Sequence, residues 1–411
     1  MSLPDLKKIA REYWPLAALL AAGLLLRLPS PEGITHYLTP QEFQRDLAVL
    51  KEMDSGRLLL IGPPSIFNGF RFGPLYYYLH YPLASLGGFK EYSLALTSLC
   101  FSLLTVVLTF LTAQRWFKDR KTAFLAAGLL TFSILDISFA KYGSSPNTVP
   151  FFTLFFFYQL EKFLAGKGGI ADAALLGLAW AAAAQLHGIP LLSLTLVVSA
   201  AIFLTKARPR AGRLLAIFAA AALLYSPYLY YQFTHGFSDI GALAGALGTE
   251  PSFMTYPERF AELASFALAL VVRYKYLFNA DLMSGMILLL ANTLAVSLVW
   301  VVEKDRRRRP VPTPAVLAPS VRMTLILWLA APALVLLLPI SRVNVMPYHY
   351  FIMLIPVGYL LLALGLDRLK RHGLRYTAGA ILASYGLWQA AQIIQYHLEY
   401  PSVLTAWLAG R

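Results

Sequence analysis

Long apolar segments alternate with shorter polar ones along most of this chain of 411 residues. Many of the apolar runs approach the roughly 20 residues that an α-helix needs to cross a bilayer. We expect about eleven spans, at residues 13–29, 92–114, 122–140, 148–165, 170–187, 189–205, 213–231, 283–302, 323–340, 350–366 and 374–394. The pattern predicts an all-α, polytopic integral membrane protein, because a β-barrel would show short alternating segments instead.

Two segments, 58–90 and 257–280, are apolar but are interrupted by Pro, Gly and charged residues. We expect interfacial helices or re-entrant loops there, although either segment could contain another span. They fall in the two long loops of the predicted topology, at about 30–91 and about 232–282, and long loops usually carry function. No internal repeat or soluble domain is visible, so residues 1–411 are expected to form a single membrane domain.

The composition agrees with a membrane protein, since 58% of the residues are hydrophobic and only 14% are charged. The net charge of +14 does not indicate nucleic-acid binding. With the N-terminus in the cytoplasm, about two thirds of the 35 Lys and Arg residues fall in cytoplasmic loops, as the positive-inside rule expects. Both long loops and the C-terminus then lie outside.

The N-terminus and the single cysteine restrict the possible processing, disulfide bonds and metal sites of the chain. Met1 to Glu12 is charged, and no small-residue cleavage site follows the first apolar run, so we expect an uncleaved first span. Cys100 is the one cysteine, which excludes a disulfide within the chain and a cysteine metal cluster.

The first long loop contains a pair of carboxylates four residues apart, Glu42 and Asp46, with Arg45 between them. A spacing of four residues places both on one face if the segment is helical. Such a pair is often only a solvated helix surface. A carboxylate above a membrane-embedded pocket is also a plausible general base, because a hydroxyl or amine must lose a proton when it attacks.

Several motifs resemble those of the GT-C membrane glycosyltransferases, in the bacterial branch similar to protein O-mannosyltransferases and to the lipid A aminoarabinose transferase. The most specific are the first-loop segments Gln41–Asp46, Gly62–Pro64 and Phe72–Tyr78, and the turn Pro146–Phe152. Less specific ones are Ala140–Tyr142, Gln185–His187 and His349–Pro356. The resemblance covers most of the chain in layout and implies a GT-C fold.

The resemblance also implies an activity. Such enzymes take a sugar from a polyprenyl-phosphate donor and pass it, with inversion, to a glycan, lipid or protein acceptor. Many relatives have Asp where this chain has Glu42, so the choice of base between Glu42 and Asp46 is open; we favour Glu42 slightly, with Asp46 as its partner or as a metal ligand. The implied location is the bacterial cytoplasmic membrane, with membrane lipids around it and the active site outside.

The leaving phosphate would need cations. The candidates in outside segments are Arg27, Arg71, Lys141, Arg259, Arg273, Lys275 and Arg342. We expect Arg273 and Lys275, with Arg342, to bind the donor phosphate, although Arg, Lys and Tyr at an interface can also be anchors.

Other polar residues could contribute. His187 and His349 lie at outer ends of spans and are more often packing residues; with Glu42 and Asp46 they could hold a divalent metal, but no spacing requires one. Asp136, inside the third span, is a functional candidate or a partner for Lys141 one helical turn along.

Two other classes of protein remain as alternatives. A transporter or flippase of lipid-linked sugars would be expected to show repeats and charges deep in its spans. A non-catalytic assembly subunit is the second alternative. The sequence specifies neither the sugar nor the acceptor.

Overall fold

The computed structural model describes residues 3–30, 40–65, 70–90, 92–204, 211–246, 255, 257–261, 263–264, 317–336, 351–371 and 373–402. These residues form helices, and the β-bridging among them is one isolated antiparallel bridge between Pro64 and Arg71. The first half contains α1 (Leu3–Arg27), α2 (Pro40–Asp54), α3 (Leu75–Leu86), α4 (Ser93–Phe117), α5 (Arg120–Thr131), α6 (Ile134–Ala140), η1 (Ser145–Thr148) and α7 (Val149–Leu164). The second contains α8 (Ile170–Leu186), α9 (Gly188–Leu204), α10 (Ala211–Thr234), α11 (Ser238–Ala246), α14 (Pro319–Leu336), η4 (Ile352–Leu354), α15 (Ile355–Arg371) and α16 (Arg375–Glu399).

The prediction of a helical fold is therefore confirmed for the described residues. Helices occupy the predicted apolar segments, except 283–302, which lies outside the described residues. By length and apolar composition, three described helices can cross a bilayer: α4, α10 and η4–α15. The pair α5–α6, bent by 57°, makes a fourth if it is one span. The total of eleven spans stays a prediction.

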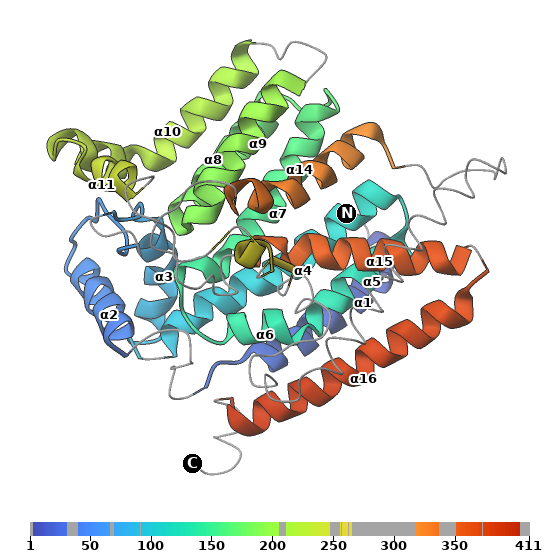
Figure 1. Ribbon diagram of the computed structural model, residues 1–411. Coiled ribbons are helices and arrows are strands. Elements are labelled where there is room, and N and C mark those ends of the chain that lie inside the picture. The colour runs from blue at the N-terminus through green and yellow to red at the C-terminus, as the bar shows by residue number, and fades with distance from the viewer. Residues whose placement is uncertain are drawn as a thin grey trace.

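Ion pairs join segments that the sequence assigns to the cytoplasm, namely Arg115–Glu161, Lys162–Asp172 and Arg371–Asp119. The helices α2, α3 and α11 lie together on one side of the bundle, and α16 lies on another side, beside α15 (Figure 1).

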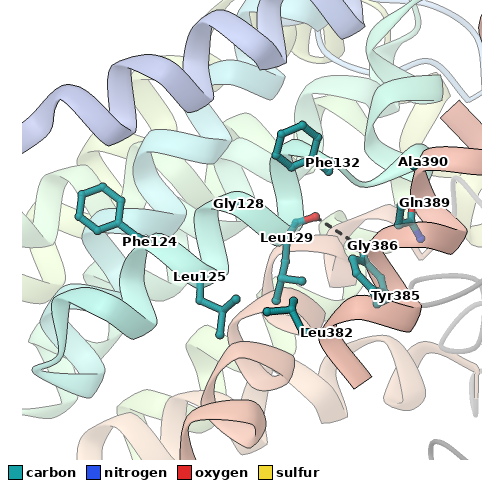
Figure 2. A pocket seen from close by; sticks show the side chains of 10 residues that line it. All are labelled: Phe124, Leu125, Gly128, Leu129, Phe132, Leu382, Tyr385, Gly386, Gln389 and Ala390. Atoms are coloured by element: carbon teal, nitrogen blue, oxygen red, sulfur yellow. Dashed lines mark hydrogen bonds between the residues drawn. The ribbon is translucent and has the colours of Figure 1, made fainter. Parts of the chain in front are cut away.

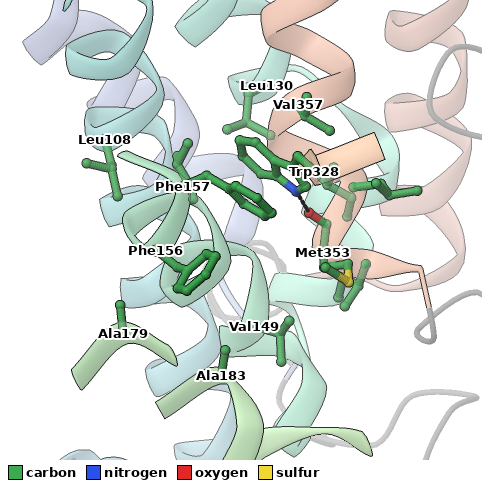
Figure 3. Close-up of a cluster of buried hydrophobic side chains, with 14 of the residues drawn as sticks. Leu108, Leu130, Val149, Phe156, Phe157, Ala179, Ala183, Trp328, Met353 and Val357 are labelled. Atoms are coloured by element: carbon green, nitrogen blue, oxygen red, sulfur yellow. Dashed lines mark hydrogen bonds between the residues drawn. The ribbon is translucent and has the colours of Figure 1, made fainter. Parts of the chain in front are cut away.

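The buried core joins the two halves of the chain through Trp328 of α14 (Figure 3). Its ring stacks on Phe157 of α7, with ring centroids 4.4 Å apart, and its indole N–H donates to the carbonyl of Met353 at 3.0 Å. A buried indole normally finds such a partner. The contact fixes η4 and the start of α15 against α7.

The bend between α5 and α6 is built around Arg27, the last residue of α1 and completely buried. Its guanidinium donates to the carbonyls of Thr131 (2.9 Å) and Leu130 (3.1 Å) in the last turn of α5, so it caps the end of this helix. It also pairs with Asp136 at 2.8 Å. The suggested pairing of Asp136 with Lys141 is therefore wrong, because the bend turns Asp136 toward α1.

Candidate functional site

Asp46 lies on the buried face of α2 and is held by two neighbours. Arg45 donates from Nε and Nη2 to Oδ1 of Asp46, both at 2.9 Å. The hydroxyl of Tyr77, in the first turns of α3, donates to the same oxygen at 3.0 Å. The Asp46 side chain is only 4% exposed. These contacts join α2 to α3 and fix the carboxylate in place.

Burial raises the pKa of Asp46 above its ordinary value, although the charge of Arg45 and the hydrogen bonds from Arg45 and Tyr77 act in the opposite direction. Burial lowers the pKa of Arg45, but the charge of Asp46 and the hydrogen bond to it have a larger combined effect, so the net shift of the pKa is upward. The charges of Tyr77 and Glu42 also raise the pKa, by less. Burial and the Asp46 charge raise the pKa of Tyr77, so its hydroxyl stays protonated as a donor. Arg45 and Tyr77 therefore favour the ionised form of Asp46, against the effect of burial.

Glu42 differs from Asp46 in its access to solvent. It is half-buried and lies one turn earlier on α2, on the same face, as the spacing predicted. It is in the first turn of the helix, where the helix dipole favours a negative charge. Of the two carboxylates, Glu42 is the one that an approaching substrate can reach more easily.

Behind Tyr77, α3 also buries Tyr76 and His80. The Tyr76 hydroxyl is fully buried near Asp46 and makes no hydrogen bond of ordinary geometry. Burial lowers the pKa of His80 to about 4, and its Nδ1 lies 2.9 Å from the Tyr76 carbonyl. His80 is thus a buried, neutral residue whose ring packs on that of Tyr76, with 4.2 Å between the ring centroids.

The described residues Gly62–Ser65 and Phe70–Gly73 pair with each other antiparallel, and we call these two segments the hairpin. The amide of Gly62 donates to the carbonyl of Phe72 (2.7 Å), and that of Phe72 donates to Pro63 (3.1 Å). A Cβ at Gly62 would lie 2.1 Å from the Gly73 carbonyl oxygen, and one at Gly73 would lie 2.1 Å from Oε1 of Gln185. The glycines of this motif are therefore required by close packing.

Arg71 attaches the hairpin to the second long loop. Its Nη2 donates to the hydroxyl of Tyr231 on α10 at 2.6 Å and lies 3.5 Å from Asp239 on α11. The Tyr228 hydroxyl donates to the Arg71 carbonyl at 3.0 Å. The sequence placed Arg71 among the outside cations but gave no indication of Tyr231 or Asp239, apart from their position at the start of the second loop.

The other predicted site residues fall into two groups. Lys141 is buried, with Nζ 3.3 Å from the Tyr400 carbonyl and over the Tyr396 ring, and burial lowers its pKa to about 8. His187 ends α8 and its Nδ1 accepts from the amide of Ile189 at 3.2 Å, at the start of α9. Among the described residues, no hydrogen bond or ion pair joins either of them to Asp46. Arg273, Lys275, Arg342 and His349 lie outside the described residues.

An apolar groove of about 420 Å³ lies between α5 and α16 (Figure 2). Leu125, Leu129, Phe132 and Leu382 are among its lining residues, and none of its lining side chains is charged. It runs beside α16, on a different side of the bundle from α2 (Figure 1). The groove suits a hydrocarbon chain, and its polar lining side chains are those of Tyr385 and Gln389.

A metal site is not formed by the residues that the structure describes, among which no group of three or more His, Cys, Asp and Glu side chains could hold an ion. Asp46, one of the suggested ligands, has the Arg45 guanidinium on its carboxylate instead.

No protein-family model and no curated protein matches the sequence. The structure is similar to that of ArnT from Cupriavidus metallidurans bound to undecaprenyl phosphate, with a TM-score of 0.58 and 17% identity over 90% of this chain and 64% of that one. It is also similar to the oligosaccharyltransferase of Archaeoglobus fulgidus in complex with zinc and sulfate, with a TM-score of 0.52 and 13% identity over 92% of this chain and 53% of that one.

Both neighbours are GT-C glycosyltransferases, so the fold implied by the sequence motifs is confirmed. The chain spans less than two thirds of the length of either neighbour.

Proposed function

We propose that this protein is a membrane glycosyltransferase that moves a sugar from a polyprenyl-phosphate donor to a nucleophilic acceptor. Two findings support this proposal. The first is the GT-C fold, shared with a structure bound to undecaprenyl phosphate. The second, which carries most weight, is the arrangement of Glu42, Arg45 and Asp46 beside Tyr77 on the first loop.

In the proposed reaction, Glu42 is the general base. It takes the proton of an acceptor hydroxyl or amine while the acceptor attacks the anomeric carbon. The bond from that carbon to the phosphate oxygen breaks, and polyprenyl phosphate leaves with the bonding electrons. Direct displacement of this kind inverts the anomeric configuration.

Asp46 has a different role in this proposal, because its carboxylate is enclosed by Arg45 and Tyr77 and is almost unexposed. It positions Arg45, whose side chain is 36% exposed. A fixed guanidinium beside the base keeps the site polar and oriented before substrate arrives. Asp46 is therefore a positioning residue and Glu42 the catalytic one.

The leaving phosphate requires cations that are not part of this cluster. We retain Arg273, Lys275 and Arg342, from outside the described residues, as the proposed ligands of the donor phosphate. Charge-assisted hydrogen bonds from such groups stabilise the negative charge that develops on the leaving oxygen. The site would lie at the outer face of a bacterial cytoplasmic membrane, where a lipid tail remains in hydrocarbon.

A divalent metal does not fit the Glu42–Asp46 pair. A cation bound to Asp46 would meet the Arg45 guanidinium, which already contacts Oδ1 at 2.9 Å. The zinc in the structure of the oligosaccharyltransferase neighbour is therefore not carried over to these two residues.

Purified protein in detergent, supplied with radiolabelled polyprenyl-phosphate sugars and a cell-envelope acceptor extract, tests the proposal. The expected result is labelled acceptor together with equimolar polyprenyl phosphate. Sugar movement across reconstituted vesicles with the donor left intact would instead identify a flippase and contradict the proposal.

A further inference from the structure

Three polar side chains at the junction of the hairpin with α10 and α11 are not accounted for by the chemistry above. Gln232 of α10 is completely buried, and neither its amide nitrogen nor its amide oxygen has a hydrogen-bond partner. Asp239 of α11 is 1% exposed, and its Oδ2 has no partner. Native proteins leave few such groups, so unpaired buried atoms on two residues seven positions apart require an explanation.

A tight turn joins α10 to α11, between Gln232 and Asp239. The amide of Phe237 donates to the Gln232 carbonyl at 2.9 Å, which closes the end of α10 and starts α11 directly after it. Tyr228, one turn before Gln232 on α10, donates to the Arg71 carbonyl. Asp239 thus reaches the hairpin through Arg71, and Gln232 lies on the turn of α10 that follows the Tyr228 contact.

Arg71 is the third member and is incompletely used. Nη2 contacts Tyr231 and, at the long distance of 3.5 Å, Asp239. The side chain is 37% exposed, so part of the guanidinium is open to a ligand. Its planar group also lies over the Tyr231 ring, with 5.2 Å between Cζ and the ring centroid.

The charges of this cluster indicate which ligand it suits. A phosphate at Arg71 would also face the buried carboxylate of Asp239, whose like charge opposes it. A neutral ligand rich in hydroxyl groups has no such conflict. Hydroxyls donate to a carboxylate and an amide oxygen and accept from an amide and a guanidinium, so they match every unpaired atom of the cluster.

We propose that Arg71, Gln232 and Asp239 form a subsite for the hydroxyl groups of a neutral sugar. This inference rests on the proposed function, and it adds the place at which the sugar itself is recognised. Without the sugar, the cluster contains buried polar groups that lack hydrogen-bond partners. Such a local departure from good packing is typical of binding sites.

Saturation-transfer NMR on the purified protein tests the subsite separately from catalysis. The probes are the methyl glycosides of mannose, glucose, galactose and N-acetylglucosamine, with inorganic phosphate as the competing anion. We expect at least one glycoside to bind, and phosphate not to displace it. Asp239→Asn, which keeps the shape of the side chain, should weaken this binding about tenfold or more, because a hydrogen bond to a charged group is lost.

Gln232→Leu should abolish the glycoside signal and also raise the melting temperature, because an apolar side chain replaces an unpaired amide. The matched controls are Gln395→Leu, on the exposed surface of α16, and Glu258→Gln, an exposed carboxylate in the same long loop as Asp239. Both should bind glycoside as the wild type does.

Three results would overturn the subsite: no glycoside binds, binding survives both Asp239→Asn and Gln232→Leu, or phosphate displaces the glycoside. In turnover assays, Asp239→Asn should raise KM for the donor if the bound sugar is the transferred one, or for the acceptor if it is not. An unchanged pair of KM values would also contradict the proposal. Glycoside binding without any transfer from polyprenyl-phosphate sugars would leave the subsite standing and remove the proposed function.

Discussion

Arg27 was one of the cations available for the donor phosphate on sequence grounds, but its contacts predict a purely structural role. The guanidinium is fully buried and pairs with Asp136, whose side chain is 4% exposed. Removing one partner of a buried ion pair costs about 3–5 kcal/mol, because the other charge is left uncompensated. For a protein whose free energy of unfolding is about 5–15 kcal/mol, Arg27→Met should thus remove a large part of the stability.

The double variant Arg27→Met with Asp136→Leu should be more stable than Arg27→Met alone, since replacing both charges by apolar groups avoids the unpaired carboxylate. Denaturation in mixed micelles, followed by tryptophan fluorescence, measures the four free energies of the double-mutant cycle. Arg57→Met is the control, because Arg57 forms an exposed ion pair with Glu52 and should contribute little.

The opposite pattern would refute this assignment. If Arg27→Met unfolds like the wild type but binds polyprenyl phosphate more weakly, Arg27 is a ligand of the phosphate and its contact with Asp136 is incidental.

Two further changes test the first loop. Tyr77→Phe removes a hydrogen bond that favours ionised Asp46, so the acidic limb of the pH–rate profile should move to higher pH. The control is Tyr81→Phe on the same helix, which should leave the limb in place. An unmoved limb in Tyr77→Phe would show that ionisation of Asp46 does not limit the rate. Gly62→Ala places a Cβ 2.1 Å from the Gly73 carbonyl oxygen, so limited proteolysis should cleave the hairpin of this variant faster. The control is Gly241→Ala, whose Cβ meets no neighbour. Equal rates of cleavage in the two variants would mean that the hairpin tolerates the methyl group.

The helical segments could be predicted because hydropathy is a local property of the chain. The segment at 122–140 shows the limit of that approach, since it is one apolar run in the sequence but two helices in the structure, bent by 57°. The bend depends on Arg27, which is more than 100 residues away from the carbonyls of Leu130 and Thr131. A local pattern does not reveal a partner that is distant in the sequence, so the sequence predicts the neighbouring Lys141 as the ion-pair partner of Asp136.

In the candidate site too, the sequence predicts what depends on local spacing and misses what depends on distant contacts. The shared face of Glu42 and Asp46 follows from helical spacing alone, and the structure has both on α2. Their difference in exposure does not follow from spacing, because it is set by α3, which buries Asp46 under Tyr77. The contacts of Arg71 with Tyr231 and Asp239 span 160 and 168 residues, which explains why the cluster with Gln232 was not foreseen.

The central claim is that Glu42 is the base of a sugar transfer. Single-turnover kinetics with a polyprenyl-phosphate sugar test it most directly, comparing Glu42→Gln with Glu52→Gln, an exposed carboxylate of the same helix. Glu42→Gln should lower the rate of transfer about a hundredfold to ten-thousandfold with unchanged donor affinity, as expected for loss of a general base. Glu52→Gln should react like the wild type. Full transfer by Glu42→Gln, with the protein folded and the donor bound, would contradict the account.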